Sequence, residues 1–251
     1  MHLTPATLET DQFRAVLLPG FGTEGGYSLL VDETTQSHVN PDDPEDLQLP
    51  YVRTIAAIVD ALFAPDTSVN ALHLGAGALT LPRFVTHTRP GSSQRVVELH
   101  GDLLDFVLDA IPLNDPSGVE FVVADAVAYV ETLADDAARF DLVVVDVYTG
   151  SDAPDAVAAS QFHTALRAAL APGGIVVVNA FTASGPDLAR DVEDALREVH
   201  GHVIAIADAD LLSGTRIGNI VFAATDHEPD VDALAVALTA RGSLVAPDPR
   251  D

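Results

Sequence analysis

The sequence predicts an α/β protein built on a mostly parallel β-sheet that helices cover on both faces. From about residue 67 onward, short apolar runs alternate with amphipathic helical stretches. Runs of Val, Ile and Leu without polar alternation are typical of parallel strands buried on both sides. A length of 251 residues accommodates one principal core with a small addition.

Seven apolar runs are predicted as strands, namely residues 69–74, 95–99, 120–124, 141–147, 173–180, 203–207 and 217–224. Helical periodicity fills five of the gaps between them, at residues 79–88, 102–111, 126–138, 160–170 and 185–199. The last gap, residues 208–216, is short and turn-like, so we expect the final strand to be antiparallel. By analogy, that ending favours a Rossmann-like sheet of the methyltransferase type over a dinucleotide dehydrogenase sheet.

Residues 1–50 differ from the remainder of the chain. Two short β-rich runs, 13–18 and 27–31, flank a glycine-rich turn and predict a β-hairpin appendage. A helix is expected over residues 51–63, with one apolar face made of Val52, Ile55, Ile58, Val59 and Leu62. We therefore expect two domains, a small N-terminal β-rich one at 1–50 and a Rossmann-like one at 51–251.

Composition narrows the possible partners. The formal net charge of −26 would repel nucleic acid and anionic lipid head groups, so neither is expected as a partner. The negative field could attract cationic amines, or it could serve solubility alone. The chain has no cysteine, no secretory signal pattern and no long apolar run, which favours the cytoplasm over export or a membrane.

A glycine turn, Gly75-Ala76-Gly77, directly follows the first predicted strand of the main sheet and precedes a helix. Such a turn lets the backbone approach a bound nucleoside beside the helix N-terminus. Thr80 stands where a dinucleotide fingerprint has its third glycine, which disfavours a pyrophosphate-bearing cofactor. Taken alone, the turn could equally be structural.

Carboxylates end three successive predicted strands. Glu98 stands where an acidic residue can accept hydrogen bonds from the ribose hydroxyls of an adenosine-containing ligand. Asp125, followed by Ala126, could accept from an adenine amino group, and Asp146 ends the fourth strand. Since the carboxyl ends of parallel strands share one edge, these groups should converge on one crevice with Gly77. The alternatives are that Asp125 caps the next helix and that Asp146 only begins a loop.

The order of these motifs resembles the spermidine synthases and related aminopropyltransferases. The resemblance runs from about residue 29 to 224 and rests on Gln36, Tyr51, Gly75-Ala76-Gly77, Glu98, Ala124-Asp125, Asp146, Ser213-Gly214 and Ile217-Gly218. It implies a homodimer that transfers an aminopropyl group from decarboxylated S-adenosylmethionine to a small amine such as a diamine. It also implies that Gln36 lies at the donor's sulfur end, that Glu98 and Asp125 with Ala126 hold the nucleoside, that Asp146 holds the attacking amine, and that Tyr51 packs at the gate between the two substrates.

The sequence departs from the family pattern where the family binds its amines. Ala78 replaces an acidic residue of the glycine loop, Thr149 replaces a second loop carboxylate, Val52 follows Tyr51, and Leu211-Leu212 replace a tyrosine. Asp152 or Asp155 could supply the missing carboxylate. The expected function is therefore spermidine synthase-like transfer with weak or altered acceptor use, Asp146 taking the amine proton.

Two other functions remain open on the same residues. An S-adenosylmethionine-dependent methyltransferase would use the same glycine turn and Glu98, and a non-catalytic relative could bind a nucleoside. No metal is expected, because the histidines, among them His38, His73 and His163, lack the spacing of metal ligands.

Overall fold

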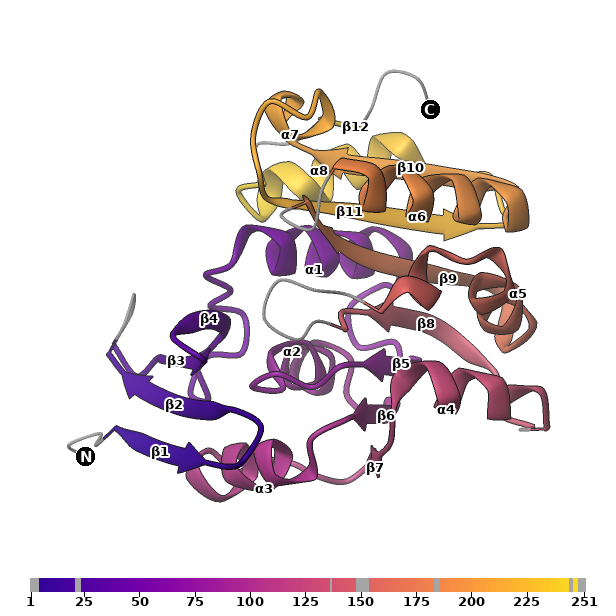
Figure 1. Cartoon of the computed structure of the whole chain (residues 1–251). Helices are drawn as coiled ribbons and strands as arrows, with labels where there is room; N and C mark the ends of the chain where they lie inside the picture. Colours follow the sequence, from indigo (N-terminus) through magenta and orange to yellow (C-terminus); the bar gives the residue numbers. More distant parts are fainter. Residues whose placement is uncertain are drawn as a thin grey trace.

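The computed structural model describes residues 5–20, 24–135, 137–147, 154–182, 186–243 and 246–247. Its main sheet runs in the order β12-β10-β11-β9-β8-β5-β6-β7 (Figure 1). The strands are β5 (Asn70–Leu74), β6 (Ser93–Glu98), β7 (Val119–Val123), β8 (Phe140–Val145), β9 (Leu170–Phe181), β10 (His202–Ala207), β11 (Asn219–Thr225) and β12 (Ala246–Pro247). The five strands from β7 to β9 are parallel, and β11 pairs antiparallel with both β9 and β10. The mostly parallel Rossmann-like prediction is confirmed.

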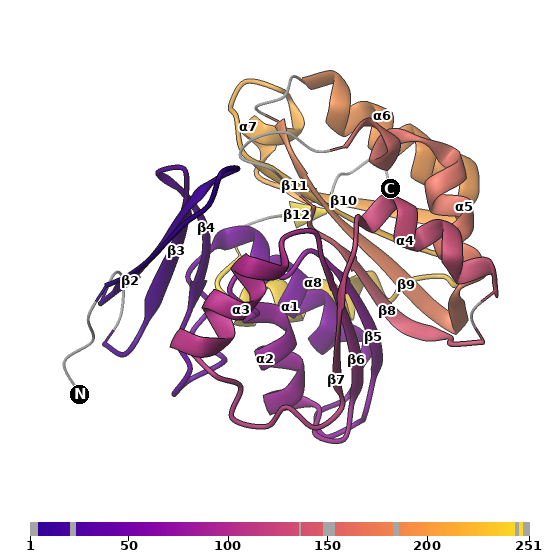
Figure 2. The ribbon, with the colours of Figure 1, turned by 60° about the horizontal axis from the view of Figure 1, so that its bottom comes forward.

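Helices cover both faces of this sheet (Figure 2). One face carries α4 (Ala126–Thr132), α5 (Ser160–Ala168) and α6 (Pro186–Val199), and the other carries α1 (Pro50–Leu62), α2 (Thr80–Thr88), α3 (Gly101–Ala110) and α8 (Val231–Ala240). The two-residue period of β8 sends Val143 and Val145 into the first layer and Leu142 and Val144 into the second. A continuous apolar run is thus buried on both sides.

An antiparallel sheet of four strands precedes α1 in the chain. It consists of β1 (Ala6–Glu9), β2 (Arg14–Pro19), β3 (Tyr27–Val31) and β4 (Thr34–Val39). Its inner side chains, such as Leu17 and Leu29, share an apolar cluster with Leu79 of the glycine loop and Leu104 of α3. The small sheet is therefore packed against the segment that follows β5.

The structure differs from the sequence prediction in five places. The N-terminal unit has four strands instead of a two-stranded hairpin, and β12 adds an eighth strand to the predicted seven. The turn-like residues 208–216 contain a short helix, α7 (Ala209–Leu212), and α8 was not predicted. On α1, Val52, Ile55, Ile58 and Val59 are buried as expected, but Leu62 is 43% exposed because it lies at the helix end.

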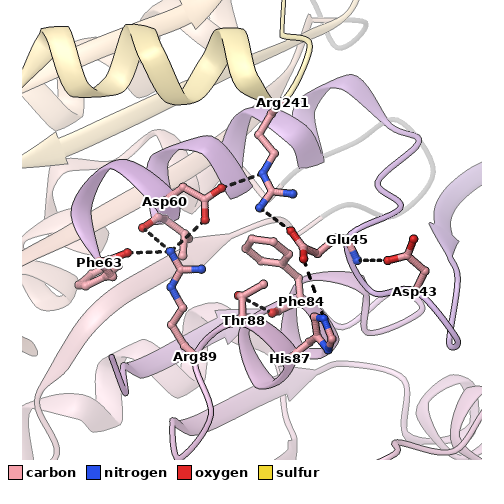
Figure 3. A network of polar contacts seen from close by, with 10 residues as sticks. Asp43, Glu45, Asp60, Phe63, Phe84, His87, Thr88, Arg89 and Arg241 are labelled. Carbon is pink, nitrogen blue, oxygen red and sulfur yellow. Dashed lines mark hydrogen bonds and ion pairs between the residues drawn. The ribbon is translucent and has the colours of Figure 1, made fainter. Parts of the chain in front are cut away.

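An ionic network around the buried Arg89 side chain connects three helices (Figure 3). Asp60 of α1 receives Arg89 Nη2 on Oδ1 at 2.9 Å and Arg241 Nε on Oδ2 at 2.7 Å. Arg89, at the end of α2, also donates to the carbonyl oxygen of Phe63 at 2.7 Å. Arg241, at the end of α8, reaches Glu45 at 3.1 Å and stacks over the Phe84 ring. The network thereby joins the connector before α1 to the C-terminal helix.

Within the described residues, no helix combines the length and the apolar character that crossing a membrane requires.

Candidate functional site

The parallel register brings the predicted site residues to one edge of the sheet. Leu74 of β5 lies beside Val97 of β6 and Val145 of β8, and Glu98 lies beside Val123 of β7. The residues that follow these positions therefore leave the sheet together at its carboxyl edge. In an open α/β sheet this edge is where ligands bind.

The glycine turn approaches its neighbours too closely for any side chain. Gly75 has φ +95°, and a Cβ atom built on it would lie 2.1 Å from the carbonyl oxygen of Asp146. Gly77 has φ +49°, and its Cβ would lie 2.3 Å from Ser37 Oγ. Ser37 Oγ accepts a hydrogen bond from the Ala78 amide at 3.1 Å, so β4 lies directly over the turn. Gly75 is required by this packing because its Cβ would meet backbone, whereas a Cβ at Gly77 would displace the Ser37 hydroxyl from its hydrogen bond with Ala78.

Replacing Gly75 by Ala is expected to lower the free energy of unfolding by about 1–3 kcal/mol, since the new Cβ collides with backbone. Gly173→Ala is the matched control, because Gly173 also has a positive φ of +84° but has no atom within 4 Å of its Cβ position. Urea denaturation of both variants distinguishes the cost of the collision from the cost of a positive φ at a non-glycine residue. Equal losses in the two variants would argue against a collision at Gly75.

Glu98 is buried and its side chain is hydrogen-bonded to the backbone of the glycine turn. Its Oε2 accepts from the Ala76 amide at 3.0 Å, and its Oε1 accepts from the His100 amide at 2.9 Å. A carboxylate has about four acceptor positions, so each oxygen can still accept one further donor. The side chain thus fixes the loop and retains capacity for a ligand hydroxyl.

Asp125 is exposed and caps α4. Its Oδ1 accepts from the Ala128 amide at 2.8 Å, while Ala126 is buried in the first turn. The capping alternative is therefore present in the structure. The second oxygen takes no part in that cap, so adenine binding by Asp125 and Ala126 stays a prediction.

Asp146 lies at the centre of a polar cluster drawn from three elements. Its Oδ2 accepts from the Tyr51 hydroxyl of α1 at 3.1 Å, and its Oδ1 accepts from the Asn179 amide of β9 at 2.7 Å. Burial raises the pKa of the Asp146 carboxyl, and the hydrogen bonds from Asn179 and Tyr51 oppose that rise. A carboxylate with a raised pKa and two fixed donors has the properties of a general base.

The other predicted residues lie on β4, in the segment after β8, or outside the described part. Gln36 is half-buried on β4, next to Ser37, and Asp155 is exposed at the start of a short 3-10 turn, residues Asp155–Ala158. Asp152 and Thr149 lie outside the described residues. The sequence reasoning missed Asn179 as a site residue, although a polar side chain within the run Val176–Ala180 was a usable signal.

Two pockets among the described residues lie away from the carboxyl edge. The larger, about 380 Å³, is open and polar and is lined by the network residues Glu45, Asp60, His87, Arg89 and Arg241. The smaller, about 30 Å³, is apolar and lies between α1, α8 and the sheet. An adenosine-sized hollow between Gly77, Glu98, Asp125 and Asp146 is not one of them, and residues 148–153 beside Asp146 are not described.

Among the described residues, no three His, Asp or Glu side chains gather as a metal site. Two histidines have core roles instead. His73 Nε2 lies 2.9 Å from Gln94 Oε1, and burial lowers the pKa of His73 to about 4. His163 Nε2 lies 2.7 Å from the carbonyl oxygen of Val157, and burial lowers its pKa to about 4 as well. Both are neutral packing residues at pH 7.

No family model matches the chain. Sequence comparison nevertheless finds relatives that are polyamine aminopropyltransferases. The polyamine aminopropyltransferase of Chromobacterium violaceum is 28% identical over 151 residues, which are 60% of this chain and 56% of that protein. The polyamine aminopropyltransferase of Neisseria meningitidis serogroup A is 23% identical over 206 residues, covering 82% of this chain and 75% of that protein. The first match thus spans little more than half of the relative's length.

Solved structures extend the match to nearly the whole chain. A probable spermidine synthase from Corynebacterium glutamicum superposes with a TM-score of 0.85 at 27% identity and covers 96% of this chain and 89% of that one. Human methyltransferase-like protein 13, solved with SAH, has a TM-score of 0.64 at 19% identity, covering 78% and 91%. The fold and the acidic edge beside the glycine turn therefore define a Rossmann-like protein of the methyltransferase type.

Within that class, the chain is spermidine synthase-like: it is similar in sequence to polyamine aminopropyltransferases, and in sequence and fold to the probable spermidine synthase. The family resemblance in the sequence is confirmed.

Proposed function

We propose that this protein transfers an aminopropyl group from decarboxylated S-adenosylmethionine to a small amine, with Asp146 as the proton acceptor. The observation that carries the proposal is the Asp146 carboxylate, which accepts from Tyr51 and Asn179 beside the glycine turn. The aminopropyltransferase relatives support it, and one spermidine synthase with the same fold, at 13% identity, was solved with the transition-state analogue AdoDATO.

The reaction is an in-line displacement. The amine nitrogen attacks the carbon next to the donor's sulfonium, the carbon–sulfur bond breaks, and its electron pair stays on sulfur as methylthioadenosine leaves. An amine with a pKa near 10 is almost wholly protonated at pH 7, so a base must hold the proton that it sheds. The raised pKa of the Asp146 carboxyl suits it to that role.

The remaining predicted residues receive roles as part of the same proposal. Gly75 and Gly77 let the donor approach the backbone, Glu98 accepts from its ribose, Asp125 with Ala126 binds its adenine, and Gln36 lies near its sulfur. Tyr51 packs between donor and acceptor, and Asp152 or Asp155 binds the distal ammonium.

The acceptor side of the site favours weak or altered amine use. Ala78 is fully buried, and its amide is bonded to Ser37, so position 78 offers the ligand neither charge nor hydrogen bond. Each lost charge-assisted hydrogen bond is worth about 1.5–3 kcal/mol, or about ten- to a hundredfold in affinity. The lack of an acidic side chain at position 78 also supports an S-adenosylmethionine methyltransferase as the second candidate.

Product analysis separates the two candidates. The protein is incubated with putrescine and either decarboxylated S-adenosylmethionine or S-adenosylmethionine, and the products are identified by mass spectrometry. Methylthioadenosine with an aminopropylated amine supports our proposal, whereas S-adenosylhomocysteine supports the methyltransferase. If no product forms, calorimetry measures the binding of both donors and of methylthioadenosine. Nucleoside binding without turnover would indicate a non-catalytic relative.

Replacing Glu98 by Gln is expected to weaken methylthioadenosine binding about ten- to a hundredfold, because the ribose loses a charged acceptor. The amide oxygen of Gln can still accept one backbone hydrogen bond. The control is Glu120→Gln, since Glu120 is exposed on β7 and pairs with Arg95. Isothermal titration measures both, and unchanged affinity in Glu98→Gln would contradict the ribose role.

The homodimer and the cytoplasmic location implied by the family resemblance belong to this proposal as well. Sedimentation velocity of the purified chain measures the first of them.

A further inference from the structure

A row of hydrogen-bonded amides leads from β11 through β9 to Asp146. Asn219 Nδ2 donates to Asn179 Oδ1 at 3.0 Å, and Asn179 Nδ2 donates to Asp146 Oδ1 at 2.7 Å. Asn179 is only 4% exposed. In the antiparallel pairing, Asn179 lies opposite Val221, so Asn219 is its diagonal neighbour on the same face of the sheet.

The chemistry of these groups fixes the direction of every hydrogen bond in the row. An ionised carboxylate only accepts, so the Asn179 amide must turn its NH₂ toward Asp146. Its carbonyl oxygen then faces Asn219, which must donate in turn. Reversing any one amide would set two acceptors or two donors against each other.

We propose that Asn219 is a positioning residue that keeps the Asn179 amide turned with its NH₂ toward Oδ1 of the Asp146 carboxylate. The inference rests on the proposed function only in giving Asp146 the amine proton. Asn219 contacts Asn179 and acts on Asp146 through it. Its effect is to stabilise the ionised carboxylate, which burial alone disfavours.

Within the described residues, few groups interact with the Asp146 carboxylate. Tyr51 is the titratable group that donates to it from α1, and the neutral Asn179 amide donates from β9. From the end of β5, the glycine turn presents backbone, with Gly75 against the Asp146 carbonyl oxygen. A change at Asn219 should therefore reach Asp146 through Asn179.

Asn219→Asp inverts the row. The new carboxylate can only accept, so it competes with Asp146 for the Asn179 NH₂, and when Asn179 turns that group toward residue 219 its carbonyl oxygen faces Asp146. Asp146 then loses a donor, and its protonated form gains an acceptor. We expect its titration midpoint to rise by about one to two pH units. The measurement is ¹³C NMR of labelled Asp carboxyls without substrate, with the Asp146 signal identified by its loss in Asp146→Asn.

The new charge also acts through space, and a double-mutant cycle removes that effect. In the Asn179→Leu background no amide can turn, so Asn219→Asp then reports the charge alone. A rise at least about one unit larger with Asn179 present supports the proposal. Equal rises in both backgrounds, or no rise at all, overturn it.

Asn219→Leu is a second variant that adds no charge and is used if Asn219→Asp does not fold. It removes the donor that faces the Asn179 carbonyl oxygen, so a smaller rise of the midpoint is expected, and an unchanged midpoint counts against the proposal. The acid limb of the kcat/KM profile for aminopropyl transfer should move with the midpoint. If the NMR cycle succeeds while the wild type transfers no aminopropyl group, the proposed function fails and the positioning role stands.

Discussion

Asp146→Asn is expected to lower kcat for aminopropyl transfer by about 10²- to 10⁴-fold, the range that a general base contributes. The amide cannot take the amine proton, although it fills nearly the same space between Tyr51 and Asn179. The affinity for methylthioadenosine should change little, because the product has no amine to deprotonate. Steady-state kinetics and calorimetry on one preparation measure the two quantities.

Tyr51→Phe is the matched control for Asp146→Asn. It removes one hydrogen bond to the same carboxylate but leaves the base in place. A smaller loss of kcat is expected, with the carboxyl pKa raised further because an opposing hydrogen bond is gone. A loss as large as that of Asp146→Asn would assign the proton transfer to Tyr51 instead.

Asp146→Asn should not destabilise the fold at pH 7. Burial raises the pKa of the Asp146 carboxyl above its unfolded value, so the ionised form in the folded protein costs free energy. That cost is absent below the unfolded pKa and grows as pH rises through the folded pKa. Thermal unfolding of Asp146→Asn at pH 7 should give a Tm equal to or above that of the wild type. For the same reason, activity should fall as pH falls through the raised pKa.

Asp60→Ala has the largest expected effect on stability, a loss of about 3–5 kcal/mol in the free energy of unfolding. Arg89 has a side chain that is 2% exposed and would keep only carbonyl partners for its charge. Arg241 would lose its 2.7 Å contact as well. The Asp60 carboxylate contacts both guanidinium groups, and its removal leaves the buried Arg89 charge without its carboxylate, whereas Arg241 keeps Glu45. Urea denaturation measures the loss.

The control for Asp60→Ala is Glu9→Ala, which breaks the exposed pair between Arg14 and Glu9. Solvent screens that pair, so its removal should cost less than about 1 kcal/mol. Asp60→Asn is expected to lie between the two, because it keeps hydrogen-bond acceptance but not charge. Similar losses for Asp60→Ala and Glu9→Ala would mean that the network in Figure 3 does not stabilise the packing of the helices.

Most of the main sheet could be predicted because its strands are buried on both faces and leave unbroken apolar runs such as Leu142–Val145. The missed strand β4 has the sequence TTQSHV, and only its pairing with β3 and its contact with the glycine turn make it a strand. Helix α8 was missed because Ala and Val occur all around it, so no apolar stripe marks it in the sequence.

The positions of the candidate site residues could be predicted where they depend on the end of one strand, but not where they depend on how two strands pair. Glu98 and Asp146 end strands, and the register that brings them to one edge follows from the parallel sheet. Asn179 and Asn219 are 40 residues apart and meet only because β11 inserts beside β9. The sequence alone shows neither the pairing of β11 with β9 nor the diagonal contact between Asn179 and Asn219.

The contact between β4 and the glycine turn also constrains how this chain can change. An atom added to Gly77 would overlap Ser37 Oγ, which in turn receives the Ala78 amide. A bulkier residue at 37 would close the same gap from the other side. Positions 37 and 77 should therefore coevolve, and an alignment of relatives ought to show glycine at 77 wherever a small hydroxyl residue is found at 37.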